Sequence, residues 1–229
     1  MTSRLLAVTF AARDPGRLGR FWAALLDREV VADADGILLP GTGGQVGLRF
    51  APNREPRRGP NRLHLHLTSE HSDQDAVVAA AVASGATPLD LGRLPGETHV
   101  VLADPEGNEL CVIAPDNAYL AGCGLLGEVA GEGSRAVGLF WSEALGWPLV
   151  WDQNDETAVQ SPLGGTKVAW GGPPVAPLQQ SARQWFELTA DDPDAEAERL
   201  LALGAMRAAG NDGVVLADPG GNELRLRSG

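Results

Sequence analysis

The sequence of 229 residues predicts an α+β fold made of two tandem domains, residues 1–115 and 120–229, each built from paired βαβββ units. Three observations support this prediction. Short stretches of alternating apolar and polar residues are typical of half-buried strands, and longer stretches between them have apolar residues at helical spacing. The phrase Ala-Asp-Pro-x-Gly-Asn-Glu-Leu occurs twice, at 103–110 and 217–224. Such a repeat indicates a duplicated domain. Each copy is expected to have a mainly antiparallel sheet and two helices.

The first unit is predicted from residue 4 to residue 50. Residues 4–11 alternate and predict a strand, after which Asp14 and Pro15 supply an N-cap and a first-turn proline. A helix follows with apolar residues at Leu18, Phe21, Trp22, Leu25 and Leu26. Short strands are then predicted at 29–33, 36–39 and 45–50.

The second unit begins after a connecting loop at 51–61 that is rich in Pro, Gly and Arg. In the predicted strand 62–68, His64 and His66 alternate with leucines and therefore share one face. Asp73 can cap the next helix, and Gly85 suits its C-terminal end. The remaining strands are predicted at 87–91, 98–103 and 109–113.

The pattern then restarts. Residues 115–122 form a predicted linker, and residues 123–130 form a Gly-rich first strand. Phe140-Trp141 follows Phe21-Trp22 after 119 residues, which places an equivalent helix in the second half. The last unit is predicted from a strand at 183–189, a helix that begins at Asp192-Pro193 and ends near Gly204, and the second copy of the phrase.

Composition limits the function. A net charge of −12 argues against nucleic-acid binding, because a polyanion would be repelled. No apolar run is long enough for a membrane span, and the N-terminus lacks a secretory pattern. Two cysteines, Cys111 and Cys123, are too few for a disulfide framework or a thiolate zinc site. The sequence therefore predicts a soluble cytoplasmic protein.

Several motifs together resemble the vicinal oxygen chelate superfamily, which includes glyoxalase I, bleomycin-resistance proteins, extradiol dioxygenases and fosfomycin-resistance enzymes. They are Phe21-Trp22, Asn61-Arg62-Leu63-His64-Leu65, Asp104–Glu109, Phe140-Trp141 and Asp218–Glu223. The resemblance covers nearly the whole chain and is closest to two tandem glyoxalase-like domains. It implies that each half curls eight strands into a cup with helices on the convex face. It also implies an intramolecular pseudo-dimer of the two halves, and it allows a homodimer of the chain.

In the first half, the resemblance implies metal-ligand positions at Ala7, His64 and Glu109. Alanine cannot bind a metal, so His66 or His99 would have to complete the set for Zn, Fe, Mn or Ni. In the second half, the same positions fall on Leu126, Trp185 and Glu223, and Glu187 matches His66. No metal is expected there.

Two functions follow as hypotheses. The first is a glyoxalase/bleomycin-resistance-like protein that binds a small organic molecule in a cup without a firmly held metal. Its candidate ligand-binding residues are His64, His66, His99, Trp185, Glu187 and Glu223. The alternative is a metal-dependent lyase, isomerase or dioxygenase, with His64, Glu109 and His66 as ligands and Glu109 as the catalytic carboxylate. A third interpretation of Glu109 and Glu223 is purely structural, either pairing with an arginine or lying in solvent.

Overall fold

The computed structural model describes residues 3–229 except 56–58, 71, 91–97, 176–182 and 210–212. Its elements form four βαβββ units. Unit 1 consists of β1 (Arg4–Ala12), α1 (Pro15–Leu26), β2 (Val31–Asp33), β3 (Gly36–Leu39) and β4 (Gly47–Pro52). Unit 2 consists of β5 (Leu63–Leu67), α2 (Gln74–Ser84), β6 (Thr87–Pro88), β7 (Val100–Ala103) and β8 (Glu109–Val112).

The second half repeats this order after a short 3₁₀ helix, η1 (Ala118–Leu120). Unit 3 consists of β9 (Leu126–Gly131), α3 (Arg135–Leu145), β10 (Leu149–Gln153), β11 (Glu156–Gln160) and β12 (Lys167–Trp170). Unit 4 consists of β13 (Gln184–Ala190), α4 (Pro193–Ala202), β14 (Met206–Arg207), β15 (Val214–Ala217) and β16 (Glu223–Ser228). The strand predicted at 123–130 begins only at Leu126, because Gly122 and Gly124 adopt positive φ between η1 and the strand.

The helix ends follow the predicted local chemistry. Asp14 caps α1 by accepting a hydrogen bond from the Arg17 amide, and Asp192 caps α4 in the same way. Asp73 caps α2, whose C-terminal cap is Gly85 with φ 117°. These caps fix where each helix leaves the strand that precedes it.

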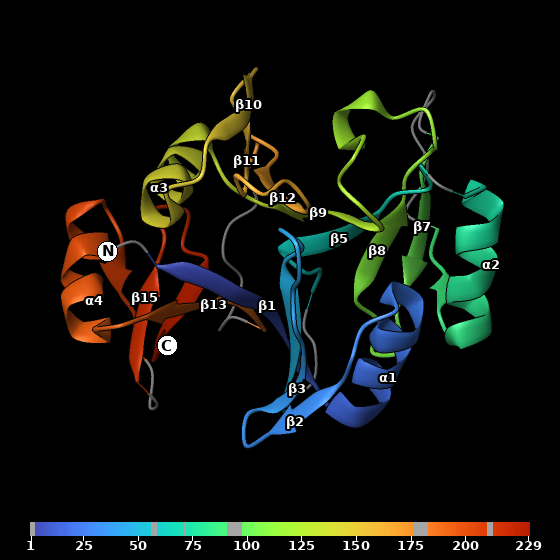
Figure 1. The fold of residues 1–229 in the computed structure, drawn as a ribbon, viewed down its shortest axis with the longest axis horizontal. Helices are drawn as coiled ribbons and strands as arrows, with labels where there is room; N and C mark the ends of the chain where they lie inside the picture. Colours follow the sequence, from blue (N-terminus) through green and yellow to red (C-terminus); the bar gives the residue numbers. More distant parts are fainter. Residues whose placement is uncertain (1–2, 56–58, 71, 91–97, 176–182, 210–212) are drawn as a thin grey trace.

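The strands form two eight-stranded mixed sheets. Sheet A has the order β14-β15-β16-β13-β1-β4-β3-β2, and sheet B has the order β10-β11-β12-β9-β5-β8-β7-β6. Figure 1 shows sheet B across the top of the molecule and sheet A from the left to the bottom, with α1 and α2 on one side and α3 and α4 on the other. The predicted fold class, α+β with paired βαβββ units, is confirmed.

The units pair differently from the expectation that each half of the chain forms its own cup. Sheet A joins units 1 and 4 through β1 and β13, and sheet B joins units 2 and 3 through β5 and β9. The four units have nearly the same pattern, so alternation alone does not identify which first strands pair. Residue ranges 1–115 and 120–229 therefore describe the sequence repeat, and their role as separate folding units stays a prediction.

The two repeated motifs meet in the core. The indole nitrogen of Trp22 on α1 donates to Asp104 at 3.1 Å, and Trp141 on α3 donates to Asp218 at 2.9 Å. Both carboxylates are buried and also accept from Asn108 or Asn222 of their own turn. Each clamp thus fastens the first helix of a half to the closing hairpin of the same half, although these belong to different sheets.

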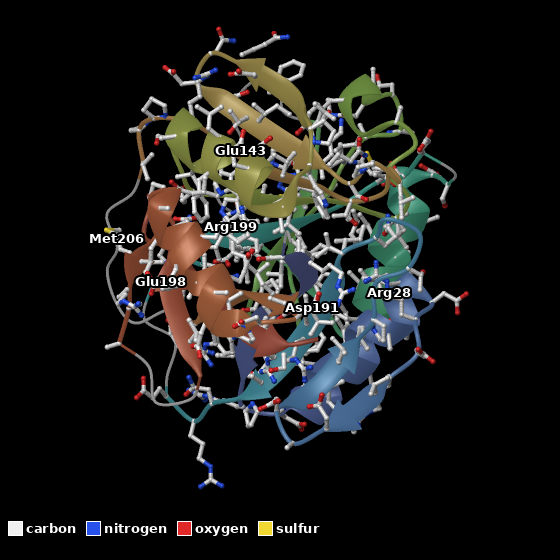
Figure 2. The ribbon with its side chains drawn as sticks, turned by 60° about the vertical axis from the view of Figure 1, so that its left-hand side comes forward. Arg28, Glu143, Asp191, Glu198, Arg199 and Met206 are labelled. Carbon is white, nitrogen blue, oxygen red and sulfur yellow. The ribbon has the colours of Figure 1, made fainter. Side chains whose placement is uncertain are left out.

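Arg199 joins the two helices of the second half. Its guanidinium donates to the backbone carbonyls of Glu143 and Ala144 at the end of α3, and it pairs with Glu196 on its own helix. Figure 2 shows Arg199 between α4 and α3, next to Glu143. Cationic groups at a helix C-terminus are favourable because the last carbonyls lack helical partners.

Candidate functional site

Four neighbouring strands of sheet B present a row of polar side chains. The register places Lys167 of β12 opposite Glu128 of β9, Glu128 opposite His66 of β5, and His66 opposite Cys111 of β8. A second row lies on the same face, two residues away along each strand, and consists of Ala169, Ala130 and His64. Glu109 precedes Leu110, the partner of Leu65, and so continues this second row beside His64. We call this face of sheet B, with both rows, cup B.

The first row contains a buried ion pair. His66 Nδ1 lies 2.7 Å from Glu128 Oε2, and the side chain of Glu128 is 7% exposed. Burial alone lowers the pKa of His66, but the hydrogen bonds and charges of Cys111 and Glu128 outweigh it and raise this pKa to about 10. Burial acts to raise the pKa of Glu128, yet His66, Tyr119 and Lys167 together lower it. The pair is therefore imidazolium and carboxylate at neutral pH.

Tyr119 comes from η1, in the linker between the halves, and covers this pair. Its hydroxyl donates to Glu128 Oε1 at 2.7 Å, and its ring meets Trp151 edge to face with 5.4 Å between centroids. Lys167 donates to the backbone carbonyl of Tyr119, and its Nζ lies 3.9 Å from the centre of the tyrosine ring. Burial, with the charge of Glu128, raises the pKa of Tyr119, so the phenol stays protonated.

His64 differs from His66 in charge and orientation. Its Nε2 lies 3.0 Å from the backbone carbonyl of Asn61, which can only accept, so Nε2 carries the proton. Burial lowers the pKa of His64, although the charge of Glu109 acts in the opposite direction. His64 is therefore a neutral imidazole whose Nδ1 lone pair can accept a hydrogen bond.

Three residues of the second row, His64, Ala130 and Ala169, line a pocket of about 370 Å³. Ala130 and Ala169 leave room above the sheet, and Tyr119 and Trp151 form aromatic walls. The remaining lining residues are Arg62, His66, Glu128, Gly131, Glu132, Glu156, Thr157, Trp170 and Gly171. Pockets for small organic molecules typically combine apolar walls with a few polar groups in this way.

The equivalent face of sheet A, which we call cup A, carries larger side chains. Thr9 pairs with Trp185 and Arg49 just as Ala130 pairs with His64 and Ala169. Thr9, Arg49 and Trp185 therefore occupy the level at which cup B has its pocket floor. All three are buried, so this level of cup A is filled by the chain itself.

An ion network occupies the rest of cup A. Glu187, which is fully buried, accepts from Thr9 Oγ1 at 2.9 Å, Arg49 Nε at 2.9 Å and Arg227 Nη2 at 3.2 Å. Arg49 Nη1 also donates to both carboxylate oxygens of Asp33, at 2.7 and 2.8 Å. A buried charge is tolerated when it is paired and hydrogen-bonded in this manner.

Trp185 and Glu223 are joined through Arg225. The Arg225 guanidinium lies 3.8 Å from the centre of the Trp185 ring and 2.7 Å from Glu223 Oε1. The chain's own arginine thus covers one face of the indole of Trp185, which was a candidate ligand-binding residue. The structural interpretation of Glu223, pairing with an arginine of the cup, agrees with this contact.

The predicted site residues are accordingly divided between the sheets. His64, His66 and Glu109 lie together in cup B, whereas Trp185, Glu187 and Glu223 lie in cup A. Ala7, the implied partner of His64, is opposite Glu187 in sheet A. His99 precedes β7 and does not line the cup B pocket.

Glu128 is not apparent from the sequence repeat because of a β-bulge. Pairing between β5 and β9 skips Gly127, just as pairing between β1 and β13 skips Leu6. Glu128, and not Leu126, is therefore equivalent to Ala7, while Leu126 is buried in the core. The offset of 119 holds for the helices only. An offset of 121 residues between the first strands, which aligns Leu6 with Gly127, is the sequence signal that places Glu128 at the position of Ala7.

Metal-type side chains are present in cup B, but their arrangement does not suit a metal. Among the described residues, no three His, Cys, Asp or Glu side chains are placed so that they could hold one ion. Glu128 holds His66 as an imidazolium, so neither ring nitrogen of this predicted ligand offers a lone pair to a metal.

The helices in the described part of the chain are all too short or too polar to cross a membrane.

Comparisons with known proteins agree with this architecture. A model of the family described as "Glyoxalase-like domain" matches residues 7–113 and 129–227. Glyoxalase I from Zea mays has a similar structure, with a TM-score of 0.66 and 13% sequence identity over 99% of this chain and 92% of that chain. A V278E mutant of the maize enzyme gives a TM-score of 0.62 and 14% identity, with the same coverage. At this identity the likeness concerns the fold alone. No curated protein matches the sequence.

Proposed function

The chain belongs to the glyoxalase-like domain family, as the resemblance to the vicinal oxygen chelate superfamily predicts, and from this premise we propose that it binds a small aromatic molecule in cup B without a firmly held metal. The observation that carries the proposal is the contrast between the cups. Cup B has a pocket over Ala130 and Ala169, and the same level of cup A is filled by Thr9 and Arg49.

The pocket side chains suggest how such a ligand is held. A planar ring can pack against the continuous aromatic wall that Trp151 and Tyr119 form by their edge-to-face contact, where stacking and edge contacts are favourable. A hydroxyl or amine on that ring can donate to Nδ1 of the neutral His64. His66 and Glu128 already satisfy one another, so they contribute a fixed dipole to the floor and not a free charge.

The other predicted ligand-binding residues receive less support. Trp185, Glu187 and Glu223 make contacts with Arg225, Arg227 and Arg49 that a ligand in cup A would have to displace. Their roles, that of His99, and the pairing of two chains as a homodimer stay predictions. The metal-dependent alternative with His64, Glu109 and His66 also stays a prediction, and no contact among the described residues favours it.

A substitution that copies cup A into cup B tests the proposal. Aromatic compounds are first screened by thermal shift on tag-free protein, since a bound ligand raises apparent stability. Ligands that stabilise the protein are then titrated calorimetrically against Ala169→Arg, which places a long side chain where cup A has Arg49. We expect at least about tenfold weaker binding, or about 1.4 kcal/mol.

Ala83→Arg is the matched control, because it adds the same side chain to the exposed surface of α2. It should leave the affinity unchanged. Equal binding by wild type and Ala169→Arg would contradict the assignment of the ligand to cup B.

A further inference from the structure

A second pocket, of about 440 Å³, lies where loops from both halves of the chain meet. Three loops form most of its lining: one between β3 and β4, one that follows η1, and one between β11 and β12. The C-terminal end of α1 forms the rest. We call it the loop pocket. It shares no lining residue with the pocket of cup B, so a ligand bound there would occupy a separate site.

Arg28 brings a positive charge to the loop pocket. It follows the C-terminal end of α1, as Figure 2 shows, and is half-buried. Its Nη1 donates to the Val46 carbonyl at 2.7 Å, and its Nη2 donates to Gln45 Oε1 at 3.1 Å. Both acceptors are uncharged. A guanidinium has five N–H groups, so these two contacts leave three of them for another acceptor.

No carboxylate in the described part of the chain forms an ion pair with Arg28. Asp27 also lines the loop pocket, but its side chain is exposed and makes no such pair. Burial therefore lowers the pKa of Arg28, whereas the pairing of Arg199 with Glu196 raises the pKa of that arginine. A charge withdrawn from water is destabilising without a counter-ion, and an anion in the loop pocket would supply one.

Glycines leave space for such an anion beside the backbone of all three loops. A Cβ added at Gly43, Gly122 or Gly164 would meet no heavy atom within 4 Å. The amide of Gly43 donates to no acceptor among the residues that the structure describes. Backbone N–H groups in glycine-rich turns, together with an arginine, are suited to the oxygens of phosphate and carboxylate groups.

The equivalent position in the second half carries no charge. Trp147 follows Arg28 after 119 residues, and both backbone amides donate to the carbonyl five residues earlier, that of Ser142 and that of Ala23. The side chain of Trp147 packs against the hydrophobic core. Arg28 is thus the one cationic side chain that lines the loop pocket, and the repeat does not require a cation at this position.

We propose that the loop pocket binds a small oxyanion, such as a phosphate or carboxylate group, through the guanidinium of Arg28 and the backbone of the loop that contains Gly43. The anion provides the counter-ion that the chain itself does not give to Arg28. The site is distinct from cup B. Its test uses inorganic ions and acetate without any aromatic ligand, so this proposal and the proposed function fail separately.

The first measurement is a titration of tag-free, ¹⁵N-labelled protein with inorganic phosphate and, separately, with acetate. Sodium chloride keeps the ionic strength constant, so that binding is distinguished from screening. We expect saturable shifts at the Gly43 amide and at Nε of Arg28. Saturation by phosphate alone indicates a phosphoryl ligand, and saturation by both indicates that a carboxylate suffices. Shifts that do not saturate with either ion would overturn the proposal.

Arg28→Met removes the charge and keeps an unbranched side chain. We expect at least about tenfold weaker binding of the anion, or about 1.4 kcal/mol. Arg20→Met is the matched control, because it removes the same charge from the exposed surface of α1, and it should bind as wild type does. Equal affinities in wild type and Arg28→Met, or an equal loss in Arg20→Met, would contradict a specific role for Arg28.

Thr42→Glu is the second variant if Arg28→Met does not fold, as judged by circular dichroism. Thr42 lines the loop pocket with an exposed side chain, so the substitution leaves the contacts of Arg28 in place. The new carboxylate should weaken anion binding at least about fivefold, or about 1 kcal/mol. Thr42→Gln has the same size without the charge and should bind as wild type does. Equal binding by the two variants would show that the anion lies elsewhere.

Discussion

The ion pair between His66 and Glu128 connects the stability of the protein to pH. The pKa of His66 is about 10 in the folded chain, against an ordinary value of 6.5. The stabilisation from this raised pKa is complete below about 6.5 and is lost as the pH rises towards 10. The pKa of Glu128 is lowered, so its stabilisation is present above the ordinary carboxyl range and is lost as the pH falls.

We therefore expect the free energy of unfolding to fall between pH 7 and pH 9.5, by up to about 1.4 kcal/mol per pH unit. Urea denaturation at several pH values measures this slope. His66→Gln should flatten it. His64→Gln is the control and should preserve it, because the pKa of His64 is lowered and this residue titrates below the range. Equal slopes in wild type and His66→Gln would contradict the assignment.

Alternation within one strand predicts which residues share a face, but not what faces them. His64 and His66 are placed on the polar face of their strand because leucines occupy the other face. Glu128, the partner of His66, comes from the other half, and Glu128 in turn meets Tyr119 of the linker and Lys167 of β12, at separations that no local pattern encodes. The candidate site was thus predicted in part, and its ion pair was not.

Among the elements, the closing hairpin has a structural role that the sequence phrase did not reveal. Asp104 and Asp218 accept backbone hydrogen bonds within their turns and an indole hydrogen bond from the opposing helix. The Phe-Trp pair and the Asp-Pro-x-Gly-Asn-Glu phrase were both recognised, yet their contact depends on tertiary packing. Burial raises the pKa of both aspartates, which is consistent with their position inside the core.

Trp141→Phe should destabilise the protein by about 1–3 kcal/mol, because it leaves a buried carboxylate without one of its donors. Because Asp218 is fully buried, a water molecule cannot easily replace the lost indole donor. The midpoint and slope of urea denaturation measure the change. Trp147→Phe is the control at a partly buried indole outside the clamps, and it should cost less. Equal losses at the two positions would refute a specific role for the clamp.

For the molecule as a whole, the unit pattern predicted the fold class, but the pairing of units needed the structure. Units 2 and 3 are joined by the short segment that carries η1, and they share sheet B, while units 1 and 4 share sheet A. Consequently each cup combines residues from both halves. The two cups then diverge: one is filled by Arg49 and Glu187, and the other has a pocket over two alanines.

Above all, we propose that an aromatic ligand binds in cup B, which residues from both halves of the chain form. Chemical-shift mapping on ¹⁵N-labelled protein, with an aromatic ligand chosen by thermal shift, tests it most directly. We predict saturable shifts at the amides of Ala130, Ala169 and His64 and at the indole of Trp151. Shifts confined to Trp185 and Glu187 of cup A, with cup B unaffected, would contradict the claim.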